Sequence, residues 1–216
     1  MEQKEKSRQS IDYIINCSID EFARAGRLVS LNSICQNHNI SKGKLYHHFS
    51  SKDELLCACV CYCLDSLRNN IDSFQVYSSL SVHRIFHDYY SDRMEHWIQF
   101  PNQLTVLRLA YVLSQSDVFS EDSLNEIRKH QLKWRQSKKR KILEIIHSNN
   151  NKLRMSDDGI ADMLLLMYEN TFQVWEDKMI TASRNNNKEA TVKFAKELID
   201  YHDTIINTVL YGVLED

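Results

Sequence analysis

The sequence predicts an all-α protein of about nine helices, and three observations lead to this prediction. Only four of the 216 residues are glycine and one is proline, so residues that interrupt helices are rare. Apolar residues recur along the chain at the i, i+3, i+4 spacing of amphipathic helices. Short polar segments, including asparagine runs at 149–151 and 185–187, separate these stretches. The length suffices for a buried core in one large domain or two small ones.

The first helix is expected from about Ser7 to Ala25, after a charged arm (residues 1–6) that we expect to be frayed. Its apolar face follows the spacing of one buried stripe. The stripe consists of Ile11, Ile14, Ile15, Ser18 and Phe22. Gly26 is the expected stop, because glycine readily takes the left-handed conformation that ends many helices.

The next segment, from Ser30 to Lys52, predicts two short helices joined by a tight turn. Ser30 caps the first of them, and Ser41 caps the second, Lys42 to Phe49. The turn is His38-Asn39-Ile40, in which Asn39 is expected at positive φ because asparagine tolerates that conformation. The buried face of the pair is expected to hold Leu31, Ile34, Leu45 and Phe49. The other face of the second helix is basic and rich in hydrogen-bonding groups, as a reader of the DNA major groove requires.

The remaining six helices follow from caps and breaks. Ser51 and Glu54 form an expected capping box for a fourth helix that runs to about Asn69. The apolar stripe of that helix is Leu56, Cys59, Val60, Cys63 and Leu67. The later helices are expected at about 81–99, 102–113, 121–147, 157–182 and 188–214, with Pro101 and the two asparagine runs among the breaks.

The segments SKGKLYHHF and SSKDELL resemble the TetR family of transcriptional regulators. The matching positions are Ser41, Lys42, Gly43, Leu45, Tyr46, His47, Phe49, Ser51, Lys52, Glu54 and Leu55. The sequence differs from the usual pattern of the family in four respects. Asn39 and His38 occupy turn positions where the family usually has glycine and a small residue, the loop 26–34 is one residue shorter, and Lys44 replaces a small hydroxyl residue.

The resemblance implies a three-helix head with a helix-turn-helix at residues 1–50 and a helical ligand-binding and dimerisation domain at 51–216. It also implies a double-stranded DNA operator as partner. We expect Lys42, Gly43 and Lys44 near base edges, with Ser41 capping the reading helix. Phosphate contacts are expected from Ser30, Tyr46, His47 and Lys52, which would fix register.

The body is expected to form a homodimer and to bind a small molecule. The eighth helix is apolar on more than one side, and the ninth has a continuous apolar stripe. These apolar faces must pack against other helices, either of the same chain or of a second copy. The resemblance implies that these two helices form a four-helix interface with a second copy. It also implies a small-molecule pocket enclosed by the fifth to eighth helices. The expected lining residues are Tyr90, Trp97, Tyr111, Trp134 and Met167.

Four cysteines lie two apart in the fourth helix, but a shared metal site is not expected. Cys57 and Cys61 share one face, whereas Cys59 and Cys63 point nearly the opposite way. The second pair is expected in the core, and the first is a candidate for redox chemistry. The spacing of His83 and His87 allows a two-ligand metal face, although surface histidines are the simpler interpretation. We therefore expect no metal and no cofactor.

The charge distribution favours DNA contact by the N-terminal part. Residues 1–52 hold eight Lys and Arg against five Asp and Glu, whereas residues 53–216 hold 19 against 24. The basic run KWRQSKKRK at 133–141 is expected to be the solvated face of a long helix. No apolar run is long enough to span a membrane and no signal peptide is visible, so we expect a cytoplasmic protein with reduced cysteines.

The prediction from the sequence is a dimeric, ligand-responsive DNA-binding regulator that acts on a palindromic operator. We expect a repressor, because repression is the commoner behaviour in the family that the sequence resembles. One alternative is a DNA-binding regulator controlled by a protein partner or by oxidation of Cys57 and Cys61. A remote alternative is a helical-bundle enzyme. The sequence lacks the repeated Glu-x-x-His of di-iron bundles, a phosphate-binding loop and a nucleophile elbow, which argues against an enzyme.

Overall fold

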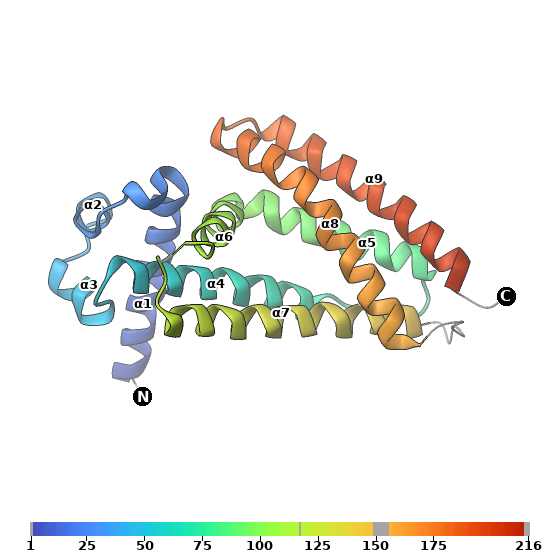
Figure 1. Cartoon of the computed structure of the whole chain (residues 1–216), viewed down its shortest axis with the longest axis horizontal. Helices are drawn as coiled ribbons and strands as arrows, with labels where there is room; N and C mark the ends of the chain where they lie inside the picture. Colours follow the sequence, from blue (N-terminus) through green and yellow to red (C-terminus); the bar gives the residue numbers. More distant parts are fainter. Residues whose placement is uncertain (1, 117, 149–155, 214–216) are drawn as a thin grey trace. The chain divides into compact units, whose positions relative to one another are not determined.

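The computed structural model describes residues 2–116, 118–148 and 156–213, and the side chains of 5–116, 118–148 and 156–210. These residues form nine α-helices and one 3-10 turn, with no strand among them, so the predicted fold class is confirmed (Figure 1). The elements are α1 (Glu2–Ala25), η1 (Gly26–Leu28), α2 (Leu31–Asn37), α3 (Lys42–His48), α4 (Lys52–Ser73), α5 (Val82–Gln99), α6 (Pro101–Leu113), α7 (Glu121–His147), α8 (Asp157–Arg184) and α9 (Lys188–Val213).

Several helix ends differ from the sequence prediction. Helix α1 begins at Glu2, so the expectation of a frayed arm is wrong for residues 2–6, which are mostly good helix formers. Phe49 caps the end of α3 instead of continuing it. Helix α4 continues to Ser73, and α6 already begins at Pro101. Proline fits the first position of a helix because its missing N–H would have no partner there.

Serine caps are present at four helix starts, of which those at Ser30 and Ser41 were predicted. Ser30, Ser41, Ser81 and Ser156 each accept a hydrogen bond from the backbone N–H three residues later. At the start of α4, only one of the two hydrogen bonds of the predicted Ser51–Glu54 capping box is formed. The Ser51 hydroxyl accepts from the Glu54 backbone N–H at 3.0 Å, but the Glu54 carboxylate accepts from the backbone N–H of Ser50 at 2.7 Å, one residue before the cap.

Three residues take the left-handed conformation that tight connections require. Gly26 ends α1 with φ of +57°, and Asn39 lies in the turn between α2 and α3 with φ of +52°. Both positions were predicted. Asn186, in the second asparagine run, also has φ of +52° and turns the chain from α8 into α9. The first asparagine run, at 149–151, lies outside the described residues.

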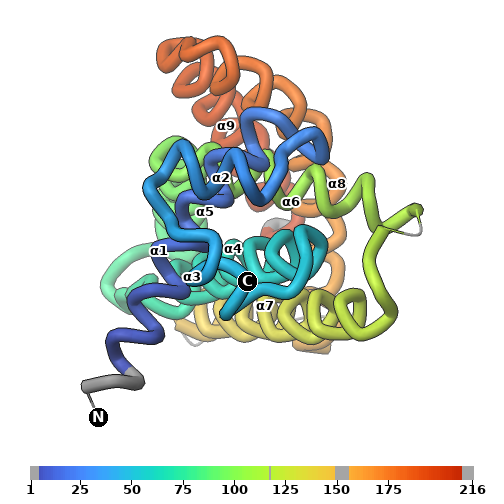
Figure 2. Tube along the Cα trace, turned by 90° about the vertical axis from the view of Figure 1, so that its left-hand side faces the viewer, coloured from blue at the N-terminus to red at the C-terminus, as the bar shows by residue number. Residues whose placement is uncertain are grey.

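The chain packs as two compact units, one comprising Met1–Ser66 and Asn102–Leu132 and the other Leu67–Pro101 and Lys133–Asp216. These two units are defined by which residues pack together. They do not test the predicted boundary between domains after residue 50, which stays a prediction. Helices α4 and α7 contribute to both units and lie side by side (Figure 2). In the first unit their contacts include the Cys57 thiol with the Ser123 carbonyl, and in the second Arg140 with Asp72.

The core of the first unit holds most of the predicted inward residues of the three N-terminal helices, whereas Ile11 and Leu31, at the ends of their apolar faces, are only half-buried. Ile14 and Phe22 of α1, Ile34 of α2 and Leu45 of α3 are at most 1 % exposed. Phe49 is also buried, directly after α3. Burial of these residues fixes which face of α3 points outward.

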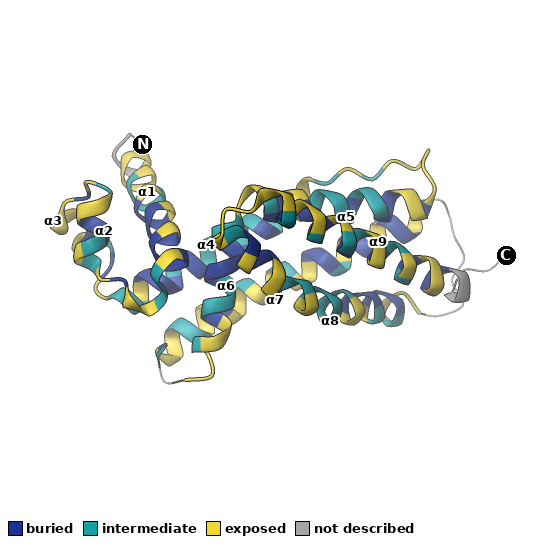
Figure 3. Ribbon diagram, turned by 90° about the horizontal axis from the view of Figure 1, so that it is seen from above, coloured by how far each residue is buried: buried dark blue, intermediate teal, exposed yellow. Residues whose placement is uncertain are grey.

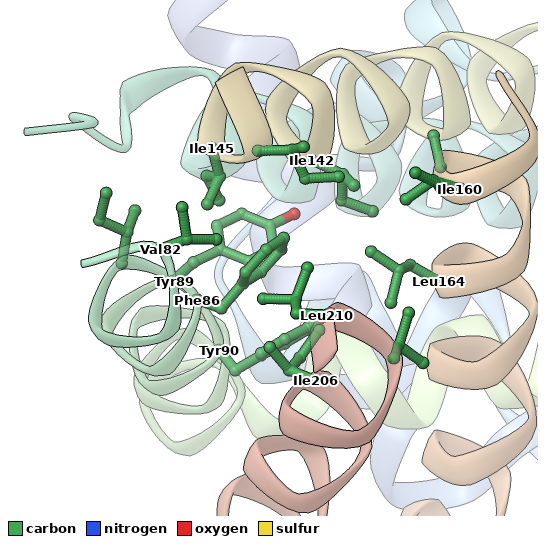
Figure 4. Packing of buried hydrophobic residues seen from close by; sticks show 14 of the residues in the cluster. Val82, Phe86, Tyr89, Tyr90, Ile142, Ile145, Ile160, Leu164, Ile206 and Leu210 are labelled. Atoms are coloured by element: carbon green, nitrogen blue, oxygen red, sulfur yellow. The ribbon is translucent and has the colours of Figure 1, made fainter. Parts of the chain in front are cut away.

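The core of the second unit is built by α5, α7, α8 and α9 (Figure 4). Phe86 and Tyr90 of α5 lie among Ile142, Leu164 and Leu210, which come from the other three helices. Helix α9 packs against both α5 and α8. None of the helices, as far as the chain is described, combines the length and apolar character needed to cross a bilayer.

Candidate nucleic-acid interface and interior cavity

Helix α3 presents the predicted basic face to solvent. Its residues Lys42, Gly43, Lys44, Tyr46 and His47 are exposed, while Leu45 is completely buried (Figure 3). The first turn carries no acidic residue. The Ser41 hydroxyl accepts from the Lys44 backbone N–H at 3.2 Å and fixes the start of the helix. The outer face thus offers positive charge and hydrogen-bond donors in the geometry of a groove-reading helix.

Neither Lys42 nor Lys44 forms an ion pair or a side-chain hydrogen bond with any other described residue. The basic run at 133–141 is different, because five of its cations are paired within the second unit. The pairs are Arg135 and Lys138 with Glu169, Lys139 with Asp158 and Asp162, Arg140 with Asp72, and Lys141 with Glu144. The free cations of the head are therefore the better partners for phosphates or base edges.

The prediction that residues 133–141 form a purely solvated face is wrong in part. Lys138 is 3 % exposed and Lys141 is 6 % exposed. Lys138 meets Glu169 at 2.8 Å, and the Lys141 ammonium donates to the Phe74 carbonyl at 2.8 Å. These partners come from distant parts of the sequence, so helix periodicity alone could not reveal them.

Gly43 has no role in packing within the described part of the chain. Its backbone is an ordinary helix, and an added Cβ would meet nothing within 4 Å. Glycine inside a helix costs about 1 kcal/mol relative to alanine. A glycine that destabilises an exposed helix without relieving any contact is consistent with the close approach of an external partner.

Two predicted phosphate-binding residues are engaged in local hydrogen bonds. The Lys52 ammonium donates to the Arg27 carbonyl at 2.9 Å and joins the start of α4 to the turn after α1. The Ser30 hydroxyl accepts from the Ser33 backbone N–H at 3.0 Å. Both side chains therefore hold the ends of helices in the head.

A further residue of the head, Glu21, did not emerge from the sequence. It lies on α1 and is 6 % exposed. One carboxylate oxygen accepts from the Asn37 amide at 2.9 Å and lies 3.3 Å from His38 Nε2, and the other accepts from Arg24 at 2.5 Å. Burial opposes ionisation of this carboxyl group, but the hydrogen bonds outweigh it and lower its pKa. Glu21 thus holds the end of α2, next to the turn that sets the direction of α3.

The second unit contains an interior cavity of about 20 Å³, close to the volume needed for one water molecule. Three predicted pocket residues, Tyr90, Trp97 and Trp134, line it. Tyr111 and Met167 do not, since Tyr111 is 56 % exposed on α6 and Met167 points outward from α8. The adjacent Leu165 and Tyr168 of α8 line it instead.

The cysteines of α4 separate into the two expected faces. Cys59 and Cys63 are completely buried, and burial raises the pKa of both thiols. Cys57 lies on an open groove of about 520 Å³ in the first unit. A hydrogen bond from the Cys61 thiol lowers the pKa of Cys57 to about 7. Cys57 is therefore partly ionised at neutral pH.

The histidines of α5 form no metal cluster. His83 is exposed, and His87 Nδ1 lies 2.7 Å from the Asp203 carboxylate. Among the described residues, no three His, Cys, Asp or Glu side chains come together in a way that could hold a metal ion.

Helices α2 and α3 form a helix-turn-helix with an exposed basic face, and this segment is also the one that matches a known family. Residues 14–59 match the family model of bacterial regulatory proteins, tetR family. A TetR-family regulator from Mesorhizobium loti MAFF303099 aligns with a TM-score of 0.70 at 14% identity, over 97% of this chain and 98% of that one. A second from Marinobacter aquaeolei VT8 aligns with a TM-score of 0.60 at 13% identity, over 100% of both chains.

A third similar structure, a TetR-family regulator from Agrobacterium tumefaciens, has a TM-score of 0.55 at 16% identity and covers 90% of this chain and 98% of that one. No curated protein matches the sequence. The matched N-terminal segment contains α2 and α3, and the fold is shared along nearly the whole chain. The N-terminal part of the chain is thus similar to the tetR family of bacterial regulatory proteins, and the chain shares its fold with solved structures of that family.

We predict that Glu21→Gln destabilises the protein by about 1–3 kcal/mol at pH 7, because it removes a buried, hydrogen-bonded charge. The folded state lowers the pKa of Glu21, so its contribution is complete above the ordinary pKa of 4.5 and disappears as the pH falls through the lower folded value. Denaturant unfolding of both proteins between pH 3 and 7 should show a difference that shrinks with acidity.

The matched control is Asp20→Asn. Asp20 is exposed and accepts from the Asn102 amide at 2.8 Å, a bond that an asparagine oxygen can also accept. This variant should stay within about 0.5 kcal/mol of the wild type. An equal effect of the two substitutions, or a Glu21→Gln effect that persists unchanged at pH 3, would refute the assigned role of Glu21.

Proposed function

We propose that the protein is a ligand-responsive repressor that binds a near-palindromic operator as a homodimer in the cytoplasm, where bacterial chromosomal DNA resides. The observation that carries the proposal is the exposed face of α3, whose Lys42 and Lys44 have no ion-pair or side-chain hydrogen-bond partner in the described part of the chain. Lysine can donate to guanine O6 and N7 in the major groove. The absence of a side chain at Gly43 lets the backbone approach the DNA closely.

The remaining exposed groups of the head fit phosphate contacts. Tyr46, 52 % exposed, and His47 lie on the outer face of α3. Ser30 and Lys52 mark the starts of α2 and α4, where backbone N–H groups favour anions. Such contacts fix the register of the reading helix without specifying the sequence.

The proposed dimer uses α8 and α9. Large apolar side chains on these helices are exposed within the single chain: Leu166, Met167, Val174, Val192 and Tyr201. A second copy placed on this surface would bury them in a four-helix interface. Two-fold symmetry would then present two copies of α3 to two half-sites, which is why a near-palindromic operator is expected.

We propose that a small molecule controls the regulator from the cavity in the second unit. Ligand binding there would shift the population of body conformations and, through α4, change the separation of the two reading helices. The aromatic residues Tyr90, Trp97 and Trp134 supply the apolar walls that such a site requires.

Selection of bound fragments from random double-stranded DNA at a stated salt concentration tests the DNA-binding part. We expect an enriched near-palindrome. Lys44→Ala and Tyr46→Ala should bind it about 10- to 100-fold more weakly, because each removes a direct contact. Gly43→Ala should also bind more weakly although it stabilises the free protein by up to about 1 kcal/mol.

Lys129→Ala is the matched control for Lys44→Ala, because Lys129 is an exposed lysine of α7 paired with Glu126 at 3.3 Å. It should bind the selected DNA like the wild type. If a folded wild-type dimer enriches no sequence, or if Lys44→Ala and Lys129→Ala behave alike, the assignment of α3 as the reading helix is wrong.

A second candidate mode of control is oxidation, which the position and pKa of Cys57 favour. Its thiolate can attack a peroxide to give a sulfenic acid and release hydroxide, or water after protonation. The Cys61 thiol can then displace water from the sulfenic acid and form a disulfide. Strain from such a bond within α4 would act directly on the helix that follows the head.

We predict that hydrogen peroxide weakens binding to the selected operator and that Cys57→Ser abolishes this sensitivity. Sulfenic acid trapping followed by mass spectrometry should place the first modification at Cys57. Cys35→Ser, at a buried cysteine of α2, should leave the response unchanged. Operator affinity that is indifferent to peroxide while Cys57 is oxidised would exclude control by this thiol.

A further inference from the structure

The cavity of the second unit is lined by two buried cations. Arg93 of α5 is 5 % exposed and Lys138 of α7 is 3 % exposed, and both lie among its lining residues. None of the lining residues is acidic. A positively charged wall in an otherwise aromatic and aliphatic cavity requires a physical explanation, because a buried charge is costly unless it is paired.

Arg93 is only partly paired. Its Nη2 donates to the Asn70 carbonyl at 2.9 Å and contacts the Asp92 carboxylate. Its Nε and Nη1 are buried and have no hydrogen-bond partner among the described residues. The face of Tyr89 lies 4.9 Å from the guanidinium and supplies a weak cation–π contact. Arg93 also interacts with the Tyr89 side chain, which opposes the rise in the pKa of Tyr89 that burial causes. An arginine in this state is ready to donate to an additional anion.

Lys138 is the second cation, and its charge is more fully balanced. Its ammonium meets Glu169 at 2.8 Å and lies 4.0 Å from the centre of the Trp134 ring. The Glu169 carboxylate also forms an ion pair with the Arg135 guanidinium at 3.7 Å. The buried cations Arg93 and Lys138 thus each meet one carboxylate, and the donors that lack a partner among the described residues are those of Arg93. An anion in the cavity could accept hydrogen bonds from these donors.

The other lining residues favour a flat ring. Tyr90 and Tyr168 stack with ring centroids 5.4 Å apart and an interplanar angle of 17°. Tyr168 and Phe172 continue the stack at 6.1 Å, and Trp97 adjoins Phe172 at 5.8 Å. Trp134 and Tyr168 are only half-buried, whereas the remaining lining residues are buried. Movement of these two rings could enlarge a cavity that now has room for about one water molecule.

We propose that the effector is a planar aromatic monoanion whose carboxylate or equivalent group accepts hydrogen bonds from Arg93, close to Lys138, and whose ring inserts beside Tyr90, Trp97 and Trp134. This inference rests on the proposed function, since it names the chemical class of the proposed effector. A buried water bound to Arg93 is the simpler occupant, and the test below distinguishes the two.

The experiment compares matched pairs of probes by isothermal titration calorimetry: benzoate with benzamide, and 1-naphthoate with 1-naphthamide. Each pair keeps the ring and removes the charge. The wild type is expected to bind at least one carboxylate about 10- to 100-fold more tightly than its amide, because a charge-assisted hydrogen bond is lost with the amide. Arg93→Met should remove this preference, and Arg93→Lys should restore part of it.

Arg84→Met is the matched control, because Arg84 lies on the same helix, is exposed and pairs with Asp88 instead of lining the cavity. It should retain the preference for carboxylates. Arg93→Met should remain folded, with a melting temperature within about 3 °C of the wild type, because it removes unpaired buried donors and leaves Asp92 partly exposed. A purely structural Arg93 would instead show a large fall in melting temperature.

Three outcomes would overturn the proposal. Equal or tighter binding of the amides would exclude an anion, and a preference that survives in Arg93→Met would exclude Arg93 as its partner. No binding of any probe by the folded wild type would leave the cavity as a site for water alone. Operator selection is measured separately, so a failure there would refute the proposed DNA-binding function while leaving the result for the anion site intact.

Discussion

The direction of α3 depends on a buried carboxylate and a left-handed turn. Glu21 binds the side chains of Asn37 and His38 at the end of α2, and Asn39 turns the chain at φ of +52° before Ser41 starts α3. Leu45 then anchors α3 in the core. Because a short helix has few contacts of its own, these constraints determine which side chains face outward. The proposed DNA contacts of α3 follow from that orientation.

The protein uses its cations in two different ways. The head leaves Lys42 and Lys44 exposed and without a partner among the residues that the structure describes, as the proposed replacement of DNA counterions requires. The second unit pairs most of its cations and buries two of them, Lys138 and Lys141, against carboxylates and a backbone carbonyl. Arg93 is intermediate, because it is buried but only partly paired. This difference distinguishes the proposed surface for nucleic acid from the proposed interior site for a small anion.

The features that depend on local sequence were predicted most successfully. The fold class, the caps at Ser30 and Ser41 and the conformation of Asn39 follow from capping residues, helix breakers and helix periodicity, which act over a few residues. The role of Glu21 was missed because Asn37 and His38 are 16 and 17 residues away and no periodic pattern links them to it. Burial of Lys138 was missed for the same reason, since Glu169 lies on another helix. In the cavity, aromatic character located Tyr90, Trp97 and Trp134, but side-chain direction decided against Tyr111 and Met167.

The central claim is that two copies of α3 read successive major grooves, and hydroxyl-radical footprinting on the selected operator tests it most directly. Two recognition helices related by two-fold symmetry should protect two patches on one face of the duplex, with centres about one helical turn, roughly 10 base pairs, apart. Both patches should disappear together when protein is replaced by Lys44→Ala at the same concentration. A single protected patch, or protection that is unchanged in Lys44→Ala, would contradict the account.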